Sequence, residues 1–489
     1  MTGIALPEPD PTIIARRPQI VRELEKLLPG GGLIADEDGR RAFDTDALTA
    51  YRRMPLAVVL PATTAEVSAV LRFCNDEGIK VIPRGAGTSL AGGALPAEDA
   101  IVVGVSRMNR LLELDTMGRT ARVQTGITNA QISAQVGDEG FFYAPDPSSQ
   151  LACTLAGNIA MNSGGAHCLK YGVTTNNILG LTLVTMDGEV IELGGAYMDA
   201  PGYDFMGLIN GSEGQFGIVT EATVRIIKKA EGARPMMIGF DSAEAAGACV
   251  SDVMASGLIP VAIEYMDKPA IKVCEEFANA GYPLDVEALL IFEVEGSDSE
   301  MEDLLARIAQ TAQAHHPHVI KISKSEAEAA AIWKGRKSAF GAIGRLADYL
   351  CMDGTIPLQS LPHVLSGISE ICARYDFAVA NIFHAGDGNL HPLVMYNANT
   401  PGEVARAEEC CGEILKLCVD VGGCLTGEHG VGIEKRDLMF LQFDEIDMVQ
   451  QMRLKTLFDP QWLLNPAKVF PLELSGQYLQ QHGGLRQAA

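Results

Sequence analysis

Apolar and polar positions alternate along the first half of the chain in patterns that predict both helices and strands. The stretch "PATTAEVSAVLRFCNDEGIKVIPRGAGTSLAGG" starts with a helix-capping signal at Thr63, Thr64 and Glu66, and its helical periodicity gives way to a short strand and a glycine loop. "IVVGV" and "TARVQTG" predict strands around an Asp-Thr-Met-Gly turn, and "LTLVTMDGEVIELGG" predicts a hairpin with Asp-Gly at its tip. Residues 50–228 therefore predict an α+β region without regular βα alternation.

A repeated pattern follows in the second half. "RPMMIGFDSAEAAGACVSDVMASGLIPVAIEYMD" and "EALLIFEVEGSDSEMEDLLARIAQTAQAHHPHVIKIS" each read as strand, polar cap, helix and strand. Two such halves predict a ferredoxin-like antiparallel sheet with helices on one face. We expect an N-terminal helical segment at 1–50, a first domain at 51–229, a second domain at 230–440 and a C-terminal segment at 441–489 that returns to the first domain.

Composition and charge narrow the class of protein. The chain has 489 residues, enough for two or three domains. Its net charge of −24, without a long Lys/Arg run, would repel a phosphate backbone, so nucleic acid is excluded as a partner. The first residues of the sequence do not resemble a secretory signal, and we find no stretch of residues apolar enough to span a membrane directly. Eleven scattered cysteines without a CxxC pair indicate reduced thiols, a cytoplasmic location and no iron–sulfur cluster in this chain.

Three segments rich in glycine and small residues are candidate ligand loops. They are "PRGAGTSLAGG" (83–93), "APDPSSQLACTLAGNIAMNSGG" (144–165) and "GSEGQFGIVTEATVRI" (211–226). Backbone amides in such loops can surround a phosphate, although a single glycine loop is more often an ordinary turn. The first segment does not open a helix, because "AGGALP" follows, and this opposes a Rossmann dinucleotide fold.

Histidines and a glutamate stand among glycines in two later segments. "NIFHAGDGNLHPLVMY" contains His384 and His391, and "GGCLTGEHGVG" contains Glu428 and His429. Two imidazoles and one carboxylate leave coordination positions open, as in catalytic zinc sites, and the same set suits non-haem iron. The other interpretation is that these side chains are ordinary core and turn residues, as most histidines are.

Taken together, the three glycine segments resemble the FAD-binding domain of the vanillyl-alcohol oxidase/p-cresol methylhydroxylase (PCMH) flavoprotein superfamily. "HAGDGNLHP", "GEHGVGIEKRDLM", "WKGRKSAFGAIGR" and "CMDGTIP" resemble its D-2-hydroxyacid dehydrogenase branch, and within it the FAD-linked subunits of glycolate oxidases. The resemblance covers about residues 20–470. It implies a PCMH-type FAD-binding domain of two subdomains, followed by a ferredoxin-like substrate domain that caps it.

The resemblance also implies which positions hold FAD. The backbone of Arg84 to Ser89 would bind the pyrophosphate, residues of the second segment would line the flavin, residues of the third would contact the adenine side, and Asn465 would close on the isoalloxazine. A covalent flavin link is not expected, because no histidine occurs in 85–93. The complete set of expected cofactor-binding residues is Pro83, Arg84, Gly85, Ala86, Gly87, Thr88, Ser89, Pro145, Asp146, Ser149, Cys153, Thr154, Gly157, Asn158, Asn162, Gly165, Glu213, Gly217, Ile218, Val219 and Asn465.

By the same resemblance, His384, His391 and Glu428 bind a divalent metal, with zinc expected first and iron or manganese as alternatives. A 2-hydroxy acid chelating this metal would have its hydroxyl acidified, and His429 would accept the proton as general base. Arg336, in "WKGRK", is expected to bind the substrate carboxylate.

Two departures from the 2-hydroxyglutarate branch favour a short substrate such as glycolate or D-lactate. Cys351 and Leu393 occupy places where that branch is expected to have a lysine and an asparagine. D-lactate or D-2-hydroxyglutarate dehydrogenase activity, a flavin-free hydrolase or iron oxygenase, and a catalytically silent assembly subunit remain as alternatives. The resemblance implies companion flavin-fold and iron–sulfur subunits that pass electrons to quinone and could hold the protein at the inner face of a membrane; an oxidase that uses oxygen is the rival.

Overall fold

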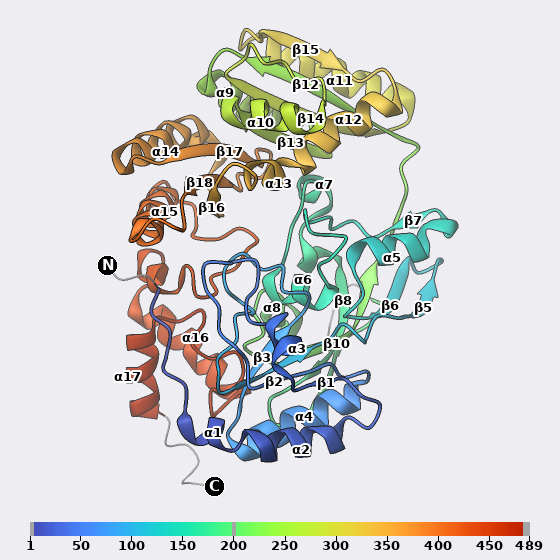
Figure 1. Ribbon diagram of the computed structural model, residues 1–489. Coiled ribbons are helices and arrows are strands. Elements are labelled where there is room, and N and C mark those ends of the chain that lie inside the picture. The colour runs from blue at the N-terminus through green and yellow to red at the C-terminus, as the bar shows by residue number, and fades with distance from the viewer. Residues whose placement is uncertain (1–3, 198–201, 483–489) are drawn as a thin grey trace. The chain divides into compact units, whose positions relative to one another are not determined.

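The computed structural model describes residues 4–197 and 202–482, and the chain divides into two compact units (Figure 1). Unit 1 contains Gly165–Gly172 and Lys229–Gly427. Unit 2 contains Ile4–Gly164, Val173–Lys228 and the chain from Glu428 onward. Unit 1 ends at Gly427, before the boundary at 440 expected from the sequence. The short segment Gly165–Gly172 belongs to unit 1, although the residues on either side of it in the chain belong to unit 2.

The first sheet of unit 2 has four strands in the order β1–β2–β4–β3. Strands β2, β4 and β3 are parallel, and β1 joins β2 in antiparallel register. Helix α4 connects β2 to β3, and its N-cap Thr63 accepts a hydrogen bond from the Glu66 N–H at 3.2 Å, which confirms the predicted cap. The strand bounds are β1 Leu33–Ile34, β2 Ala57–Val59, β3 Lys80–Arg84 and β4 Ala100–Gly104.

The second sheet of unit 2 is antiparallel, in the order β5–β6–β10–β8–β9. The predicted Asp-Gly hairpin is confirmed, since β8 pairs with β9 and Gly188 has a φ of +81°. The pairing expected for "IVVGV" is wrong: that strand is β4 in the first sheet, and the missed strand β5 lies across the Asp-Thr-Met-Gly turn from β6. The bounds are β5 Leu111–Asp115, β6 Thr120–Gln124, β8 Ile178–Val184, β9 Val190–Gly194 and β10 Ile218–Arg225, with a separate pair β7 Phe141–Phe142 and β11 Ile227–Lys228.

The C-terminal segment packs within unit 2. Its backbone pairs with β3, because the Val81 N–H donates to the Leu463 carbonyl at 2.8 Å and the Asn465 N–H donates to the Val81 carbonyl at 2.7 Å. Leu464 is fully buried in the same core as Val81 and helix α4. The helices of unit 2 are α1 Pro11–Ala15, α2 Arg17–Leu27, α3 Glu37–Arg41, α4 Thr64–Glu77, α5 Asn129–Val136, α6 Leu155–Met161, α8 Phe205–Ile209, α16 Glu445–Phe458 and α17 Leu472–His482.

Unit 1 contains one antiparallel sheet of seven strands, in the order β15–β12–β14–β13–β17–β18–β16 (Figure 1). Its first four strands have the order of a ferredoxin-like sheet, with α9 and α11 as the two connecting helices, so the predicted repeat of strand, helix and strand is confirmed. The three further strands were not predicted as part of this sheet. The bounds are β12 Gly232–Phe240, β13 Ala262–Asp267, β14 Ala288–Gly296, β15 Val319–Ile322, β16 Asp348–Cys351, β17 Ala378–His384 and β18 Pro392–Tyr396.

The helices of unit 1 bury apolar faces against this sheet and each other. In α15, Cys411 and Cys418 are buried, as the seven-residue spacing predicts for a core-facing helix. Within the described part of the chain, none of the helices is both long and apolar enough to cross a membrane. The bounds are α7 Cys168–Tyr171, α9 Ala243–Ala255, α10 Lys268–Ala278, α11 Asp298–Gln313, α12 Glu326–Lys337, α13 Ala339–Ile343, α14 Leu361–Tyr375 and α15 Glu403–Asp420.

Candidate active site

Unit 2 brings the first and second glycine segments together. The loop after β3 passes the start of α6, where a Cβ added at Gly85 would collide with Thr154 Oγ1 and lie 3.3 Å from the Gly157 Cα. Only glycine permits this approach of two backbone segments. Thr154 is the N-cap of α6, and its hydroxyl accepts a hydrogen bond from the Gly157 N–H at 3.3 Å.

Asn465 connects the first segment to the third. Its amide Nδ2 donates to the carbonyl oxygen of Gly93 at 3.2 Å and to that of Glu213 at 2.7 Å. The third segment also lies against the loop itself, since a Cβ added at Gly214 would be 3.2 Å from Pro83 Cγ. Asn465 is almost fully buried, so these bonds fix the C-terminal segment to both glycine loops.

Asn129 organises the second segment, and the sequence reasoning missed it. This buried asparagine donates to the Pro145 carbonyl at 2.8 Å, while its Oδ1 accepts from the Asn158 amide and lies 3.8 Å from Cys153 Sγ. Three of the expected cofactor-binding residues thus meet at one amide. An asparagine in the helical segment that directly precedes the loop is the sequence signal that could have identified it.

Other expected cofactor residues have structural contacts of their own. The Arg84 guanidinium donates to the Thr45 carbonyl at 2.8 Å and lies over the Phe43 ring, so the side chain turns away while the backbone forms the loop. Asn162 caps α6 in the left-handed conformation. Gly165 is the exception among the expected cofactor-binding residues, because it belongs to unit 1. Unit 2 contains the remaining members of the set, Ala86, Gly87, Thr88, Ser89, Asp146, Ser149, Gly217, Ile218 and Val219.

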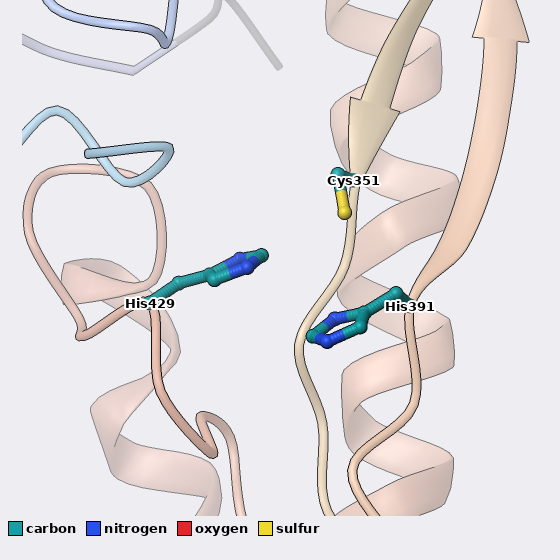
Figure 2. A group of neighbouring side chains, drawn as sticks. All are labelled: Cys351, His391 and His429. Carbon is teal, nitrogen blue, oxygen red and sulfur yellow. The ribbon is translucent and has the colours of Figure 1, made fainter. Parts of the chain in front are cut away.

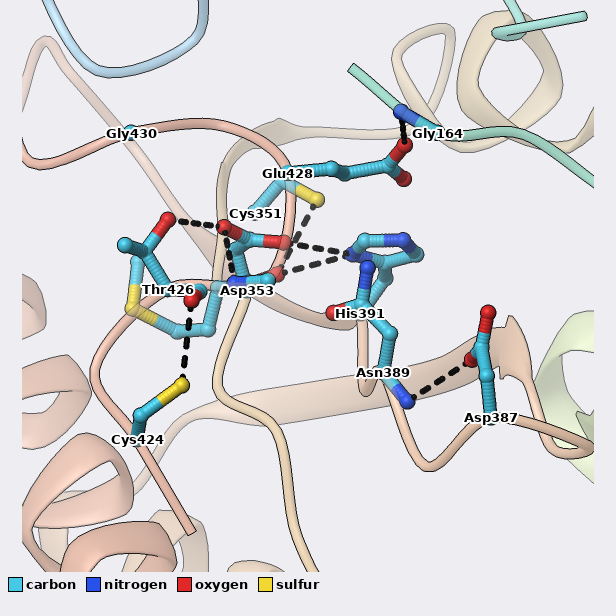
Figure 3. A network of polar contacts seen from close by, with 12 residues as sticks. Gly164, Cys351, Asp353, Asp387, Asn389, His391, Cys424, Thr426, Glu428 and Gly430 are labelled. Carbon is cyan, nitrogen blue, oxygen red and sulfur yellow. Dashed lines mark hydrogen bonds and ion pairs between the residues drawn. The ribbon is translucent and has the colours of Figure 1, made fainter. Parts of the chain in front are cut away.

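The loop that begins with Glu428 and His429 is bound to these same segments of unit 2. Glu428 Oε2 accepts a hydrogen bond from the Gly164 N–H at 2.9 Å (Figure 3). The buried Glu213 carboxylate accepts from the Val431 N–H at 2.6 Å and the Gly432 N–H at 2.7 Å. Burial raises the pKa of Glu213, and these two hydrogen bonds oppose the rise. His429 therefore lies on a short loop held at both ends by the glycine segments.

In unit 1, His384 is fixed by a buried carboxylate. His384 at the end of β17 is the cross-strand partner of Glu264 on β13, and His384 Nδ1 lies 2.7 Å from Glu264 Oε1. The other oxygen, Oε2, accepts from Arg336 Nε at 2.8 Å and forms an ion pair with Arg336 Nη2 at 2.6 Å. Burial raises the pKa of Glu264, but the charges of Arg336 and His384 lower it more, so the carboxyl stays ionised. Glu264 thus occupies the Nε and Nη2 side of Arg336, the residue expected to bind a substrate carboxylate.

His391 lies beside His384 in unit 1. The two ring centroids are 5.2 Å apart and the rings are nearly perpendicular, at 87°. His391 Nδ1 is 3.2 Å from the Met352 carbonyl oxygen, and a carbonyl can only accept, so Nδ1 carries the hydrogen. Both histidines therefore have Nδ1 engaged as a donor, which leaves Nε2 with the lone pair that a metal needs.

Two side chains that the sequence singled out, Cys351 and Leu393, lie in this region of unit 1. Cys351 lies next to His391 (Figure 2), with Sγ within 4.8 Å of a ring nitrogen. Cys351 on β16 is the cross-strand partner of Leu393 on β18, and both side chains are buried. The two positions singled out in the sequence are therefore direct neighbours on one face of the sheet.

Asp353 is a further residue of this region that sequence reasoning did not assign, although it lies in the quoted segment "CMDGTIP". It is fully buried, and its Oδ1 is 3.9 Å from His391 Nδ1. Its Oδ2 accepts from the Thr426 hydroxyl and from the Gly427 N–H at 3.0 Å (Figure 3). Asp353 thus fixes the two residues that directly precede Glu428 in the chain.

Comparisons with known proteins identify the family of the chain. The chain belongs to the family of FAD-linked oxidases: residues 55–194 match the FAD binding domain, and residues 229–469 match the C-terminal domain of FAD linked oxidases. More particularly, it is 44% identical over 468 residues to glycolate oxidase subunit GlcD of Escherichia coli (strain K12), covering 96% of this chain and 93% of that protein.

Two other comparisons extend this result. D-lactate dehydrogenase of Anaerostipes hadrus is 29% identical over 92% of this chain and 97% of its own length. The crystal structure of p-cresol methylhydroxylase with substrate bound superposes with a TM-score of 0.76 at 14% identity, covering 95% of this chain and 98% of that chain. The predicted superfamily and the PCMH-type α+β fold are confirmed. The protein is an FAD-linked oxidoreductase, and its cofactor is FAD.

Proposed function

We propose that the protein oxidises a short D-2-hydroxy acid to the 2-oxo acid, with glycolate as the first candidate substrate and D-lactate as the second. The observation that carries this proposal is the attachment of the Glu428–His429 loop to Gly164 and Glu213, in the unit that binds FAD. A basic side chain is thereby tied to the segments expected to line the flavin. The names of the relatives, a glycolate oxidase subunit and a D-lactate dehydrogenase, support this substrate class.

FAD binding is proposed at the three glycine segments and Asn465. The close approach of Gly85 to α6, and the bonds from Asn465 to Gly93 and Glu213, support a preformed site. FAD, when bound, supplies a hydride acceptor at N5 for the α-carbon of the substrate. Asn158, Asn162 and the backbone amides of the loop after β3 are polar groups suited to hold a flat, hydrogen-bonding ring and a phosphate.

A divalent cation, zinc first with iron or manganese as alternatives, is proposed at His384, His391 and Glu428. The engagement of both Nδ1 atoms supports the two histidines as ligands through Nε2. Glu428 follows Gly427 directly in the chain, and Asp353 holds Gly427. Such a cation would bind the substrate hydroxyl and one carboxylate oxygen and lower the pKa of the hydroxyl.

His429 is the proposed general base. A neutral imidazole next to a metal ligand in the sequence can accept the hydroxyl proton while the substrate is held. Arg336 is the proposed partner of the substrate carboxylate. Because Glu264 occupies the Nε and Nη2 side of the guanidinium, the hydrogens left for this role are those of Nη1 and the second hydrogen of Nη2.

The pairing of Cys351 with Leu393 supports a short substrate. Neither side chain can pair with a second carboxylate, and burying an unpaired carboxylate there would be costly. D-2-hydroxyglutarate is therefore the less favoured of the alternative substrates.

Electron transfer from FAD to companion subunits is proposed, through a flavin-fold subunit and an iron–sulfur subunit to quinone. The word "subunit" in the name of the Escherichia coli relative supports partners of this kind. The protein would then function in the cytoplasm, attached to the inner face of the membrane by its partners. Direct reoxidation by oxygen is the competing proposal.

Anaerobic mixing of the flavin-loaded protein with glycolate, D-lactate, L-lactate and D-2-hydroxyglutarate tests the function. Bleaching of the flavin is expected with glycolate or D-lactate, weaker bleaching with D-2-hydroxyglutarate and none with L-lactate. Preincubation with a chelator should abolish the response, and added zinc should restore it. Bleaching that is insensitive to the chelator would remove the metal from the mechanism, and bleaching by none of the four acids would overturn the substrate class.

A further inference from the structure

Glu264 is a charged residue inside an apolar strand. Strand β13 reads "AIEYMD", and its neighbours Ile263 and Tyr265 are buried, as is Glu264 itself, at 0% exposure. A buried carboxylate without partners would be strongly destabilising. Its presence at this position therefore requires a specific set of partners, and the structure supplies two.

The two oxygens of this carboxylate have separate partners. Oε1 accepts the hydrogen of His384 Nδ1, and Oε2 accepts a hydrogen bond from Arg336 Nε and forms an ion pair with Arg336 Nη2. The cross-strand register places Glu264 directly opposite His384, while α12 delivers Arg336 from its last turn. With Oε2 held by a planar guanidinium, the carboxylate cannot rotate away from the imidazole.

We propose that Glu264 is a positioning residue for the metal site: it fixes the orientation and tautomer of His384 so that Nε2 faces the metal, and Arg336 locks Glu264 in place. This inference rests on the proposed function, because it takes His384 as a metal ligand. Carboxylates that hold the second nitrogen of a ligating histidine typically raise metal affinity by about ten- to hundredfold. Arg336 therefore has a role that acts through Glu264, whether or not its remaining N–H groups also contact the substrate.

The same sheet provides a matched control. Glu293 on the adjacent strand β14 is also buried and also accepts from a histidine and from a residue of α12: its Oε2 lies 2.8 Å from His167 Nε2, and its Oε1 accepts from Trp333 Nε1 at 2.6 Å. His167 is not among the proposed metal ligands. A Glu-to-Gln change at 293 thus disturbs the same kind of contact without touching His384.

The test compares zinc binding by flavin-loaded wild-type protein, Glu264→Gln and Glu293→Gln, each stripped of metal and titrated with zinc against a chromophoric chelator. Glu264→Gln should bind zinc about ten- to hundredfold more weakly than wild type, because an amide at this position cannot accept from both His384 and Arg336. Glu293→Gln should bind zinc like wild type. Circular dichroism and thermal unfolding establish that each variant is folded.

Glu264→Asp replaces Glu264→Gln if the latter does not fold, since it keeps the charge opposite Arg336 but shortens the reach to His384. A folded Glu264 variant whose zinc affinity stays within about twofold of wild type would overturn this inference while leaving the metal site intact. Equal losses in the Glu264 and Glu293 variants would also overturn it, because the effect would then be general to the sheet. Failure of the wild-type protein to bind zinc or any other divalent cation would instead overturn the proposed metal site, and this inference with it.

Discussion

Two histidines of the candidate site, His384 and His391, present the same ring nitrogen to the protein. In both residues Nδ1 donates a hydrogen bond to an oxygen that can only accept: a carboxylate oxygen for His384 and a backbone carbonyl oxygen for His391. Their Nε2 atoms are thereby left as lone-pair donors, which suits them as ligands and makes them poor proton acceptors once a metal is bound. His429, the proposed general base, lies on a loop that is held at either side, because Glu428 accepts from the Gly164 N–H and Glu213 accepts from the Val431 N–H.

Replacement of His429 tests this division of roles. His429→Asn should lower turnover of glycolate or D-lactate by about 10²- to 10⁴-fold, the usual contribution of a general base, while FAD content and zinc affinity stay close to those of wild type. Steady-state kinetics with a dye acceptor measures turnover, and the flavin-to-protein ratio and a zinc titration measure the rest.

His363→Asn is the matched control for this change, because His363 lies exposed on α14 and is not part of the proposed site. Its turnover should equal that of wild type. Near-normal turnover in His429→Asn would remove His429 from the mechanism, and loss of FAD in that variant would give the residue a structural role.

At the scale of elements, strand register decides which side chains meet. Glu264 faces His384, and Cys351 faces Leu393, because each pair occupies opposite positions on antiparallel strands. A one-residue slip of β17 against β13 would turn His384 to the other face of the sheet. The N-cap of α10 helps to fix this register, since Asp267 joins the helix to β17.

Asp267 links three elements and should make stability depend on pH. Its carboxylate accepts from the Ala270 N–H at 3.1 Å at the start of α10 and from both the backbone and side chain of Asn381, at 2.8 and 2.9 Å. Burial raises the pKa of Asp267 from 3.8 to about 6, although these hydrogen bonds oppose the rise. A raised carboxyl pKa means that the folded state binds the proton more tightly, so this stabilising contribution is complete below about pH 4 and is lost as pH rises through about 6.

The free energy of unfolding of wild type, measured relative to Asp267→Asn by urea denaturation, should therefore fall by up to ~3 kcal/mol between about pH 4 and about pH 7. Asp444→Asn, at the exposed N-cap of α16, is the control with the same change in chemistry. Parallel pH profiles for wild type and Asp267→Asn would show that the carboxyl at 267 titrates normally.

The sequence predicted the helices and strands better than it predicted which strands and side chains pair with one another. The ferredoxin-like half of unit 1 follows from local signals, because each of its helices begins at a polar cap after a strand, as Ser242 and Ser297 show. Strand β5 was missed because most of its residues are at least partly exposed, and the pattern "LLELD" gives no inward face. The pairing of Arg336 with Glu264 could not be predicted, since the two are 72 residues apart and only register and helix packing bring them together. The charge of Glu264 between apolar neighbours in "AIEYMD" was the available signal.

At the scale of the whole molecule, the chain passes between the two units several times. One of these passes is the short segment Gly165–Gly172, which we call the strap; its flanking residues belong to unit 2. The strap contains α7 and packs into unit 1, where Gly386 is in close contact with Leu169. It lacks the hydrophobic periodicity of a long helix, so sequence patterns could not assign it to unit 1.

The strap should be held in unit 1 by β14. Glu295 accepts from Lys170 Nζ at 2.7 Å and from the Tyr171 hydroxyl. Because Lys170 is partly exposed, the two contacts together stabilise docking by only about 1 kcal/mol. Glu295→Ala should therefore make amide hydrogen exchange in the strap roughly fivefold faster, measured by mass spectrometry, without a similar change in α14 or α15.

Glu287→Ala is the matched control, because it removes an exposed ion pair with Lys268 near the same strand and should leave exchange in the strap unchanged. If exchange in the strap were unaffected by Glu295→Ala, packing of Leu169 and the bond from His167 to Glu293 would suffice to hold it; if exchange rose equally throughout unit 1, Glu295 would stabilise the unit and not the strap.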